Sequence, residues 1–196
     1  MAFSLLLLPV NAAWTRAIAF SVSVVIFCLA FYIYQQFDPH GGMQFREYHP
    51  WIKSYGIHYS LGLDGFSLIV LMLIATLIPS AYLLLWKNNR SKSYWISMLL
   101  IQSGISGTLF SLDLILFYFF WEAMLLPVFM IIGLFGSGNR VFSTLKVTIY
   151  TIMGSLFMFV SILYLGVAYY YEFAVWSFEM SDIATISTLH YEQKVL

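Results

Sequence analysis

The residue best suited to chemistry is Glu122, an acidic side chain within the apolar run FYFFWEAMLLPVFM. It lies about eight residues into a hydrophobic stretch, which in a helix corresponds to a depth of about 12 Å, near the middle of a bilayer. Inserting an acidic residue into a membrane at that depth costs about 2.5–3.5 kcal/mol of free energy on insertion scales. Because burial favours the neutral form, such a group could take up and release a proton. The alternative is a structural glutamic acid that stays protonated and hydrogen-bonded.

Two residues near Glu122 could assist it. Tyr118 precedes it by one helical turn on the same face and could share a hydrogen bond with it. Pro127 follows five residues later and would free a backbone carbonyl and loosen the turn, although a tolerated packing kink is an equal alternative.

A second polar pattern follows in the next apolar stretch. Thr144, Thr148, Thr151 and Ser155 recur at helical spacing, which favours hydrogen bonding between helices or a hydrated path. Lys146 lies off this stripe, near the end of the span, where it is either a second proton-carrying group or a cation that snorkels to the interface.

These residues require a membrane scaffold to position them. A span needs about 20 apolar residues, and five stretches qualify, at residues 17–34, 63–86, 94–112, 114–135 and 147–171. Lipid cannot satisfy free backbone polar groups, so the predicted fold is an all-α membrane domain covering residues 1–196. The apolar segment 3–13 is too short to span and is interpreted as a truncated or re-entrant helix.

The connecting segments sort by charge. With alternating sides, one side receives six basic residues (Arg16, Lys87, Arg90, Lys92, Arg140 and Lys146) and the other receives three. The six-cation side is therefore predicted to face the cytoplasm, or the matrix of an organelle. Every acid except Glu122 falls on the opposite side. The longest connection, residues 35–62, contains Pro39, Gly41, Gly42 and Pro50, which discourage regular structure.

The composition excludes several classes of protein. Hydrophobic residues make up 61% of the chain and charged residues 9%, whereas soluble domains carry roughly 25% charged residues. The nine basic and nine acidic residues balance, so no basic surface indicates nucleic acid. No metal site, phosphate-binding loop or dinucleotide motif is recognisable, and we expect the chain to bind no redox cofactor.

The run FFWEAMLLPVFMIIGLFG, from Phe119 to Gly136, resembles the signature of the M subunit of NADH-quinone oxidoreductase, respiratory complex I, the bacterial counterpart of mitochondrial subunit 4. HYSLGLDGFSLIVLML, from His58, LKVTIYTIMGSLFMF, from Leu145, and VWSFEM, from Val175, support the resemblance over most of the chain after residue 50. A Trp-Glu pair followed by Pro127 distinguishes this subunit from the related L and N subunits and from Mrp-type antiporters.

The resemblance implies an antiporter-like fold and a role in proton translocation, driven by redox chemistry elsewhere in the complex. NADH, FMN, iron–sulfur clusters and quinone would then be bound by other subunits. The family's intramembrane glutamate matches Glu122, and a lysine that the family has at this helix start matches Lys146. L-like and N-like subunits of the membrane arm would be its neighbours, in the inner membrane of a bacterium or of an organelle.

The chain departs from the family in length, because full-length members are more than twice as long and carry later broken helices with a partner lysine. It would then be the N-terminal part of a split subunit, completed by a second chain, or a fragment. Two other functions stay open: a structural or assembly piece without transport of its own, and a subunit of a Mrp-type cation/proton antiporter.

Overall fold

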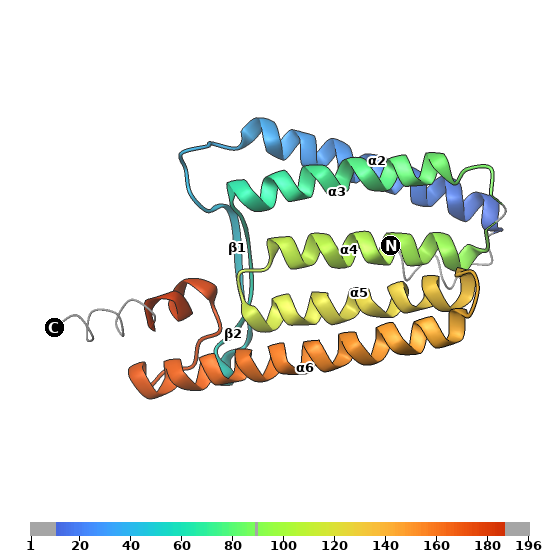
Figure 1. The fold of residues 1–196 in the computed structure, drawn as a ribbon. Helices are drawn as coiled ribbons and strands as arrows, with labels where there is room; N and C mark the ends of the chain where they lie inside the picture. The colour runs from blue at the N-terminus through green and yellow to red at the C-terminus, as the bar shows by residue number, and fades with distance from the viewer. Residues whose placement is uncertain (1–10, 89, 187–196) are drawn as a thin grey trace.

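A computed structural model describes residues 11–88 and 90–186 of the chain. Five long helices lie side by side in this part of the protein (Figure 1). They are α2 (Ala12–Gln36), α3 (Gly65–Leu84), α4 (Lys92–Phe110), α5 (Leu114–Phe135) and α6 (Arg140–Phe173). The prediction of a helical, multi-pass integral membrane protein is confirmed.

The agreement on individual spans is close but incomplete. Helices α2, α3, α5 and α6 are long and apolar enough to cross a membrane. Helix α4, predicted as the third of five spans, forms as expected, but its serines, glycines and Gln102 make it less apolar than the other four. The count of five is therefore approximate. Helix α2 begins at Ala12 rather than at residue 17, and most of segment 3–13 lies outside the described residues.

The connection from residue 35 to residue 62 is not irregular, and that prediction was wrong. It contains an antiparallel hairpin of β1 (Gln44–Ile52) and β2 (Ile57–Leu63), joined through the short 3-10 helix η1 (Lys53–Tyr55). Pro39, Gly41 and Gly42 precede the first strand instead of interrupting it. Pro50 in β1 lies opposite His58, whose N–H is directed to Asp113 and not to β1. This pair therefore exchanges no ladder hydrogen bond, and the missing N–H of Pro50 costs none.

The hairpin crosses one end of the helices, as Figure 1 shows. Leu112, between α4 and α5, donates its N–H to the carbonyl of Ser60 in β2 at 2.9 Å. On its other side the same segment bonds to the chain beyond α6. The N–H of Leu114 donates to the carbonyl of Phe178, and the N–H of Met180 donates to the carbonyl of Leu112, both at 2.9 Å. Three distant segments therefore join at this end.

Close helix packing depends on small residues in α4. A Cβ atom at Gly104 would lie 2.5 Å from the Cβ of Met124 in α5, and one at Gly107 would lie 2.3 Å from the ring of Phe120. Neither distance is possible for real atoms without displacement, so both glycines allow α4 and α5 to approach. The SGISG segment of α4, residues 103–107, is therefore a packing surface for α5.

On its other face, α4 packs with α2 and α3. Ala19, Tyr82, Trp95 and Leu99 form part of a buried cluster in which the Tyr82 hydroxyl donates to the carbonyl of Trp95 at 3.2 Å. At the same end, the guanidinium of Arg16 lies 4.6 Å from the centre of the Trp86 ring and donates to the Trp86 carbonyl. These contacts hold the first three described helices together.

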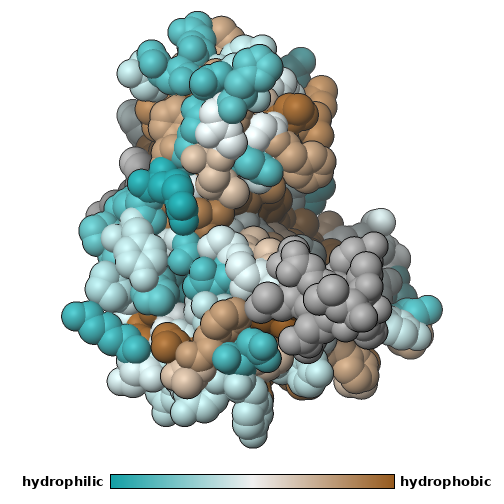
Figure 2. Space-filling view, turned by 90° about the vertical axis from the view of Figure 1, so that its left-hand side faces the viewer, coloured by the Kyte–Doolittle hydropathy of each residue, from teal (hydrophilic) through white to brown (hydrophobic). Residues whose placement is uncertain are grey.

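The two ends of the helices differ in charge, as the alternating-side assignment predicted. The start of α2 and the α3–α4 and α5–α6 connections lie at one end (Figure 1), and the six basic residues fall in these segments or within two turns of them. The hairpin, the α4–α5 connection and the segment after α6 lie at the other. Figure 2 views this second end, where hydrophilic residues surround apolar ones. The acid Glu192 lies outside the described residues.

Candidate intramembrane acid site

The structure places Glu122 on α5 in a half-buried position. Its Oε1 atom is buried, and no hydrogen-bond partner for it occurs among the described residues. The side chain of Tyr118, one turn earlier, lies near the side chains of Glu122 and of Ser155 in α6. Tyr118 is thus beside Glu122, as the helical spacing predicted, whereas a hydrogen bond between the two stays a prediction.

The position of Tyr118 is determined from α6. Its ring stacks on Phe159, with ring centres 4.8 Å apart and planes inclined by 28°. Ser155, one turn before Phe159, is 5% exposed and donates its hydroxyl to the carbonyl of Ile152 at 3.1 Å. A buried hydroxyl and an aromatic ring therefore orient the tyrosine toward the acid.

The polar stripe on α6 lies on the side that packs against α5. Thr144, Thr148 and Thr151 are partly buried and Ser155 is buried, whereas the residues between them are exposed. Thr144 and Thr151 each donate to a carbonyl four residues earlier in α6, at 2.7 Å. Their hydroxyl oxygens can still accept hydrogen bonds. A role for Thr148 and Thr151 in proton movement stays a prediction.

Lys146 does not reach this site. It is exposed, like Tyr150 and Met153, with which it shares a face. Nine residues separate it from Ser155, and at about 100° per residue the two side chains point to opposite sides of α6. The structure thus brings Tyr118, Glu122 and Ser155 together and leaves Lys146 on a face that no described residue covers.

Pro127 lies within α5, which continues unbroken to Phe135. Its side chain is buried. Because proline lacks an N–H, the carbonyl of Ala123 loses its usual helical partner, one residue after Glu122. This carbonyl adds an acceptor to the backbone beside the acid, but the helix shows no interruption there.

Asp113 is a structurally important residue that the apolar and polar patterns of the sequence do not single out. The side chain is fully buried at the start of α5. Its Oδ1 accepts from the N–H groups of Ile115 and Leu116, and its Oδ2 accepts from the N–H of His58 at 3.0 Å. An acid directly before an apolar run indicates a helix cap, but nothing local predicts the bond to a residue 55 positions away.

A comparable cap occurs at Asp64, whose Oδ1 accepts from the N–H of Ser67 at 2.8 Å. Interaction with the Ser67 side chain, and then with its backbone N–H, holds the pKa of the Asp64 carboxyl below its usual value. Within residues 11–88 and 90–186, no three His, Cys, Asp or Glu side chains form a group that could hold a metal ion.

Comparison with known proteins relates the site to a family. Residues 111–186, which include Glu122 and the whole of α5 and α6, match the family described as NADH:quinone oxidoreductase/Mrp antiporter, TM. The chain is 39% identical over 153 residues to NADH-quinone oxidoreductase subunit M of Rhodobacter capsulatus, covering 77% of this chain and 29% of that protein. It is 32% identical over 191 residues to the same subunit of Rickettsia bellii, covering 94% and 37%.

The fold has counterparts among solved structures. Respiratory complex I from Thermus thermophilus contains a chain that superimposes with a TM-score of 0.69 over 92% of the present chain and 36% of its own length, at 23% identity. The chain thus spans about a third of the length of these relatives. The resemblance drawn from the FFWEAMLLP segment is confirmed.

Proposed function

Because this chain is homologous to subunit M of NADH-quinone oxidoreductase along most of its own length, we propose that it serves, whole or in part, as a non-redox subunit of a proton-translocating NADH:quinone oxidoreductase. Its task would be to carry protons across the membrane while electron transfer occurs in other subunits. The observation that carries the proposal is the buried, unpartnered Oε1 of Glu122, with Tyr118 one turn earlier on α5 packed against Phe159 of α6 and near Ser155.

The geometry suits a proton carrier. Glu122 has one buried oxygen without a partner among the described protein atoms, so it can bind a proton or accept a further hydrogen bond. The Tyr118 hydroxyl donates when the carboxyl is charged and can accept when the carboxyl is protonated. Since a hydroxyl serves in both directions, Tyr118 and Ser155 can stabilise both protonation states of Glu122 without rearrangement of the helices.

The same geometry indicates what the chain needs from elsewhere. Lys146 is on the opposite side of α6 from Ser155 and forms no ion pair with Glu122. A cation that modulates Glu122 would therefore come from another part of the complex. We propose that L-like and N-like subunits of the membrane arm, and a second chain with the remaining helices, surround this one. NADH, FMN, iron–sulfur clusters and quinone would be bound by other subunits of the complex, located in a bacterial inner membrane or in that of an organelle.

Replacement of Glu122 by Gln tests the proposal, because the amide preserves size and hydrogen bonding but cannot titrate. In the assembled complex, Glu122→Gln should lower the number of protons translocated per NADH oxidised. Glu172→Gln is the matched control, because Glu172 is exposed near the end of α6. Unchanged pumping in Glu122→Gln, with pumping in the control also normal, would sink the proposal.

The structural alternative has support of its own. Lys146 is exposed on the opposite side of α6 from Ser155 and is not directed toward Glu122. If the chain serves only in assembly, membranes that lack it lose the assembled complex, whereas Glu122→Gln leaves both assembly and turnover normal. The two functions therefore predict opposite results for the same substitution.

The family description also includes Mrp antiporters, which supports a third function. A subunit of a cation/proton antiporter would make growth sensitive to sodium when the chain is deleted, while NADH oxidation by the membranes stays intact. Loss of NADH-driven pumping on deletion, without sodium sensitivity, would exclude it.

A further inference from the structure

A second polar site lies in the other half of the protein, away from Glu122. Gln102, in the middle of α4, is fully buried, and neither its amide oxygen nor its amide nitrogen has a hydrogen-bond partner among the described residues. An amide buried in this way is unfavourable unless its donor and acceptor are satisfied. The proposed function makes no use of this residue.

The neighbours of Gln102 follow from the packing of α2 beside α4. Ala19 of α2 packs in one cluster with Leu99, and further along both helices Ala30 lines the same cavity as Ser106. Gln102 lies between Leu99 and Ser106 on the same face of α4. Ser23 lies between Ala19 and Ala30 on α2, in the part of that helix that runs beside the stretch of α4 from Leu99 to Ser106.

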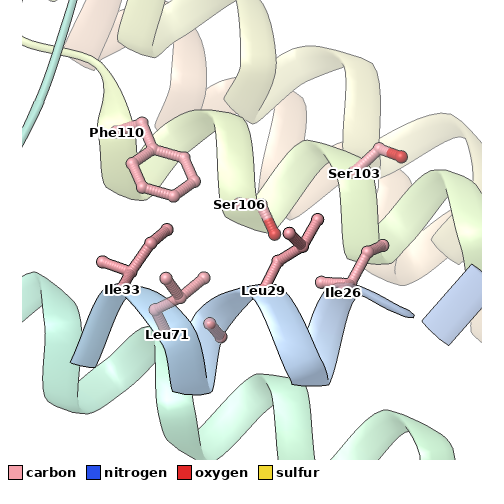
Figure 3. Close-up of a pocket in the computed structure, with 8 residues that line it drawn as sticks. Ile26, Leu29, Ile33, Leu71, Ser103, Ser106 and Phe110 are labelled. Carbon is pink, nitrogen blue, oxygen red and sulfur yellow. The ribbon is translucent and has the colours of Figure 1, made fainter. Parts of the chain in front are cut away.

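The side chains of Ser23 and Ser106 are small and polar. Ser23 is fully buried and donates its hydroxyl to the carbonyl of Phe20 at 2.7 Å, which leaves its oxygen able to accept. One turn beyond Gln102 on α4, Ser106 lines a cavity of about 340 Å³ between α2, α3 and α4. Figure 3 shows the Ser106 hydroxyl directed from α4 toward α2, beside Leu29. Ser106 therefore lies both on the cavity and one helical turn from Gln102.

We infer that Gln102, with Ser23 and Ser106, binds water molecules inside the membrane, at a site separate from Glu122. The ligand must both donate and accept, because the free groups of Gln102 include an N–H pair and a carbonyl oxygen. An ion satisfies only one of these, and the three side chains carry no charge to balance it. A buried water normally makes two to four hydrogen bonds, which these three residues can supply.

The test measures access of water to Ser106. Cys28, the exposed native cysteine of α2, is first replaced by Ser. Ser106→Cys is then treated with silver ions or a small hydrophilic thiol reagent in native membranes. Ile69→Cys in α3 is the control, because Ile69 is 70% exposed to the surroundings and, like Ser106, lies four residues from the hairpin end of its helix.

The thiol at residue 106 should react at least tenfold faster than the thiol at residue 69. Adding Gln102→Leu, which keeps the size but removes the amide, should lower the rate at residue 106 toward that of the control. A similar rate at both positions, or a rate at residue 106 that Gln102→Leu leaves unchanged, overturns the inference. So does a reaction that occurs only after extraction from the membrane, because a partner would then fill the site. Where Gln102→Leu fails to fold, the comparison of residues 106 and 69 decides alone.

Discussion

The Oδ2 atom of Asp113 accepts a hydrogen bond from the backbone N–H of His58 at 3.0 Å, and this bond holds the hairpin against the start of α5. The other carboxylate oxygen caps the helix through Ile115 and Leu116. One buried side chain therefore performs two tasks, each with its own oxygen.

Two substitutions at Asp113 should separate these tasks. In Asp113→Asn the amide oxygen can retain the helix cap, but the amide nitrogen faces the N–H of His58. We expect a loss of about 1–3 kcal/mol, because a buried donor is left without an acceptor. Asp113→Ala should cost about 1 kcal/mol more, because the cap is also lost. Thermal unfolding of the purified protein in detergent measures both losses of stability. Equal melting temperatures for the two variants would contradict the assignment of separate tasks to the two oxygens.

The raised pKa of Asp113 predicts that the stability of the protein depends on pH. Burial raises the pKa of the Asp113 carboxyl above its ordinary value, although its three backbone hydrogen bonds act in the opposite direction. Between the ordinary pKa and the raised one, the folded protein holds a proton that the unfolded chain has released. Its stability should therefore fall as the pH rises through that range.

Melting temperatures of the native protein and of Asp113→Asn, compared from acidic to neutral pH, test this dependence. The variant cannot titrate at residue 113, so its curve should lack that part of the slope. Parallel curves for the two proteins would show that Asp113 does not contribute.

Tyr118 and Ser155 should act as one unit in proton transfer. A side-chain hydrogen bond contributes about 0.5–1.5 kcal/mol, so Tyr118→Phe should slow proton translocation roughly two- to tenfold. Ser155→Ala should add little once Tyr118 is replaced, because both belong to the same network. Proton uptake by vesicles containing the assembled complex measures the four combinations, and strictly additive effects would argue against a shared network.

Lys146, unlike Ser155, should not be coupled to Tyr118. It lies on the opposite side of α6 from Ser155, so Lys146→Gln and Tyr118→Phe should have additive effects on proton translocation. A strong coupling between them would show that Lys146 reaches the Glu122 site in the assembled complex. This comparison decides between a proton-carrying group and an interfacial cation at residue 146.

The glycines of α4 predict a difference between two alanine substitutions. Gly104→Ala places a Cβ atom 2.5 Å from the Cβ of Met124, close to its backbone, so the helices must separate. We expect a cost of about 1–3 kcal/mol. Gly154→Ala is the control, because no atom lies within 4 Å of the added Cβ. It should stabilise α6 by about 0.5–1 kcal/mol through helix propensity. A destabilising Gly154→Ala, or a neutral Gly104→Ala, would contradict this reading of the interface.

Much of the protein was predictable from the sequence, because a membrane makes local patterns decisive. Long apolar runs must be helical in lipid, so the spans, their order and the separation of charge between the two ends follow from the sequence alone. Glu122 is conspicuous because an acid in such a run is costly, and Tyr118 faces it because residues four apart share a helix face.

Only the tertiary structure decided what depends on distant contacts. The hairpin forms despite its proline and glycines because Ser60 and His58 bond to the segment between α4 and α5. The same kind of contact makes Asp113 an anchor. Helical periodicity placed Lys146 and Ser155 on different faces, but it could not show that the Ser155 face packs against α5 while Lys146 stays exposed. Nor could it show that Gln102 is fully buried, because burial depends on where neighbouring helices lie.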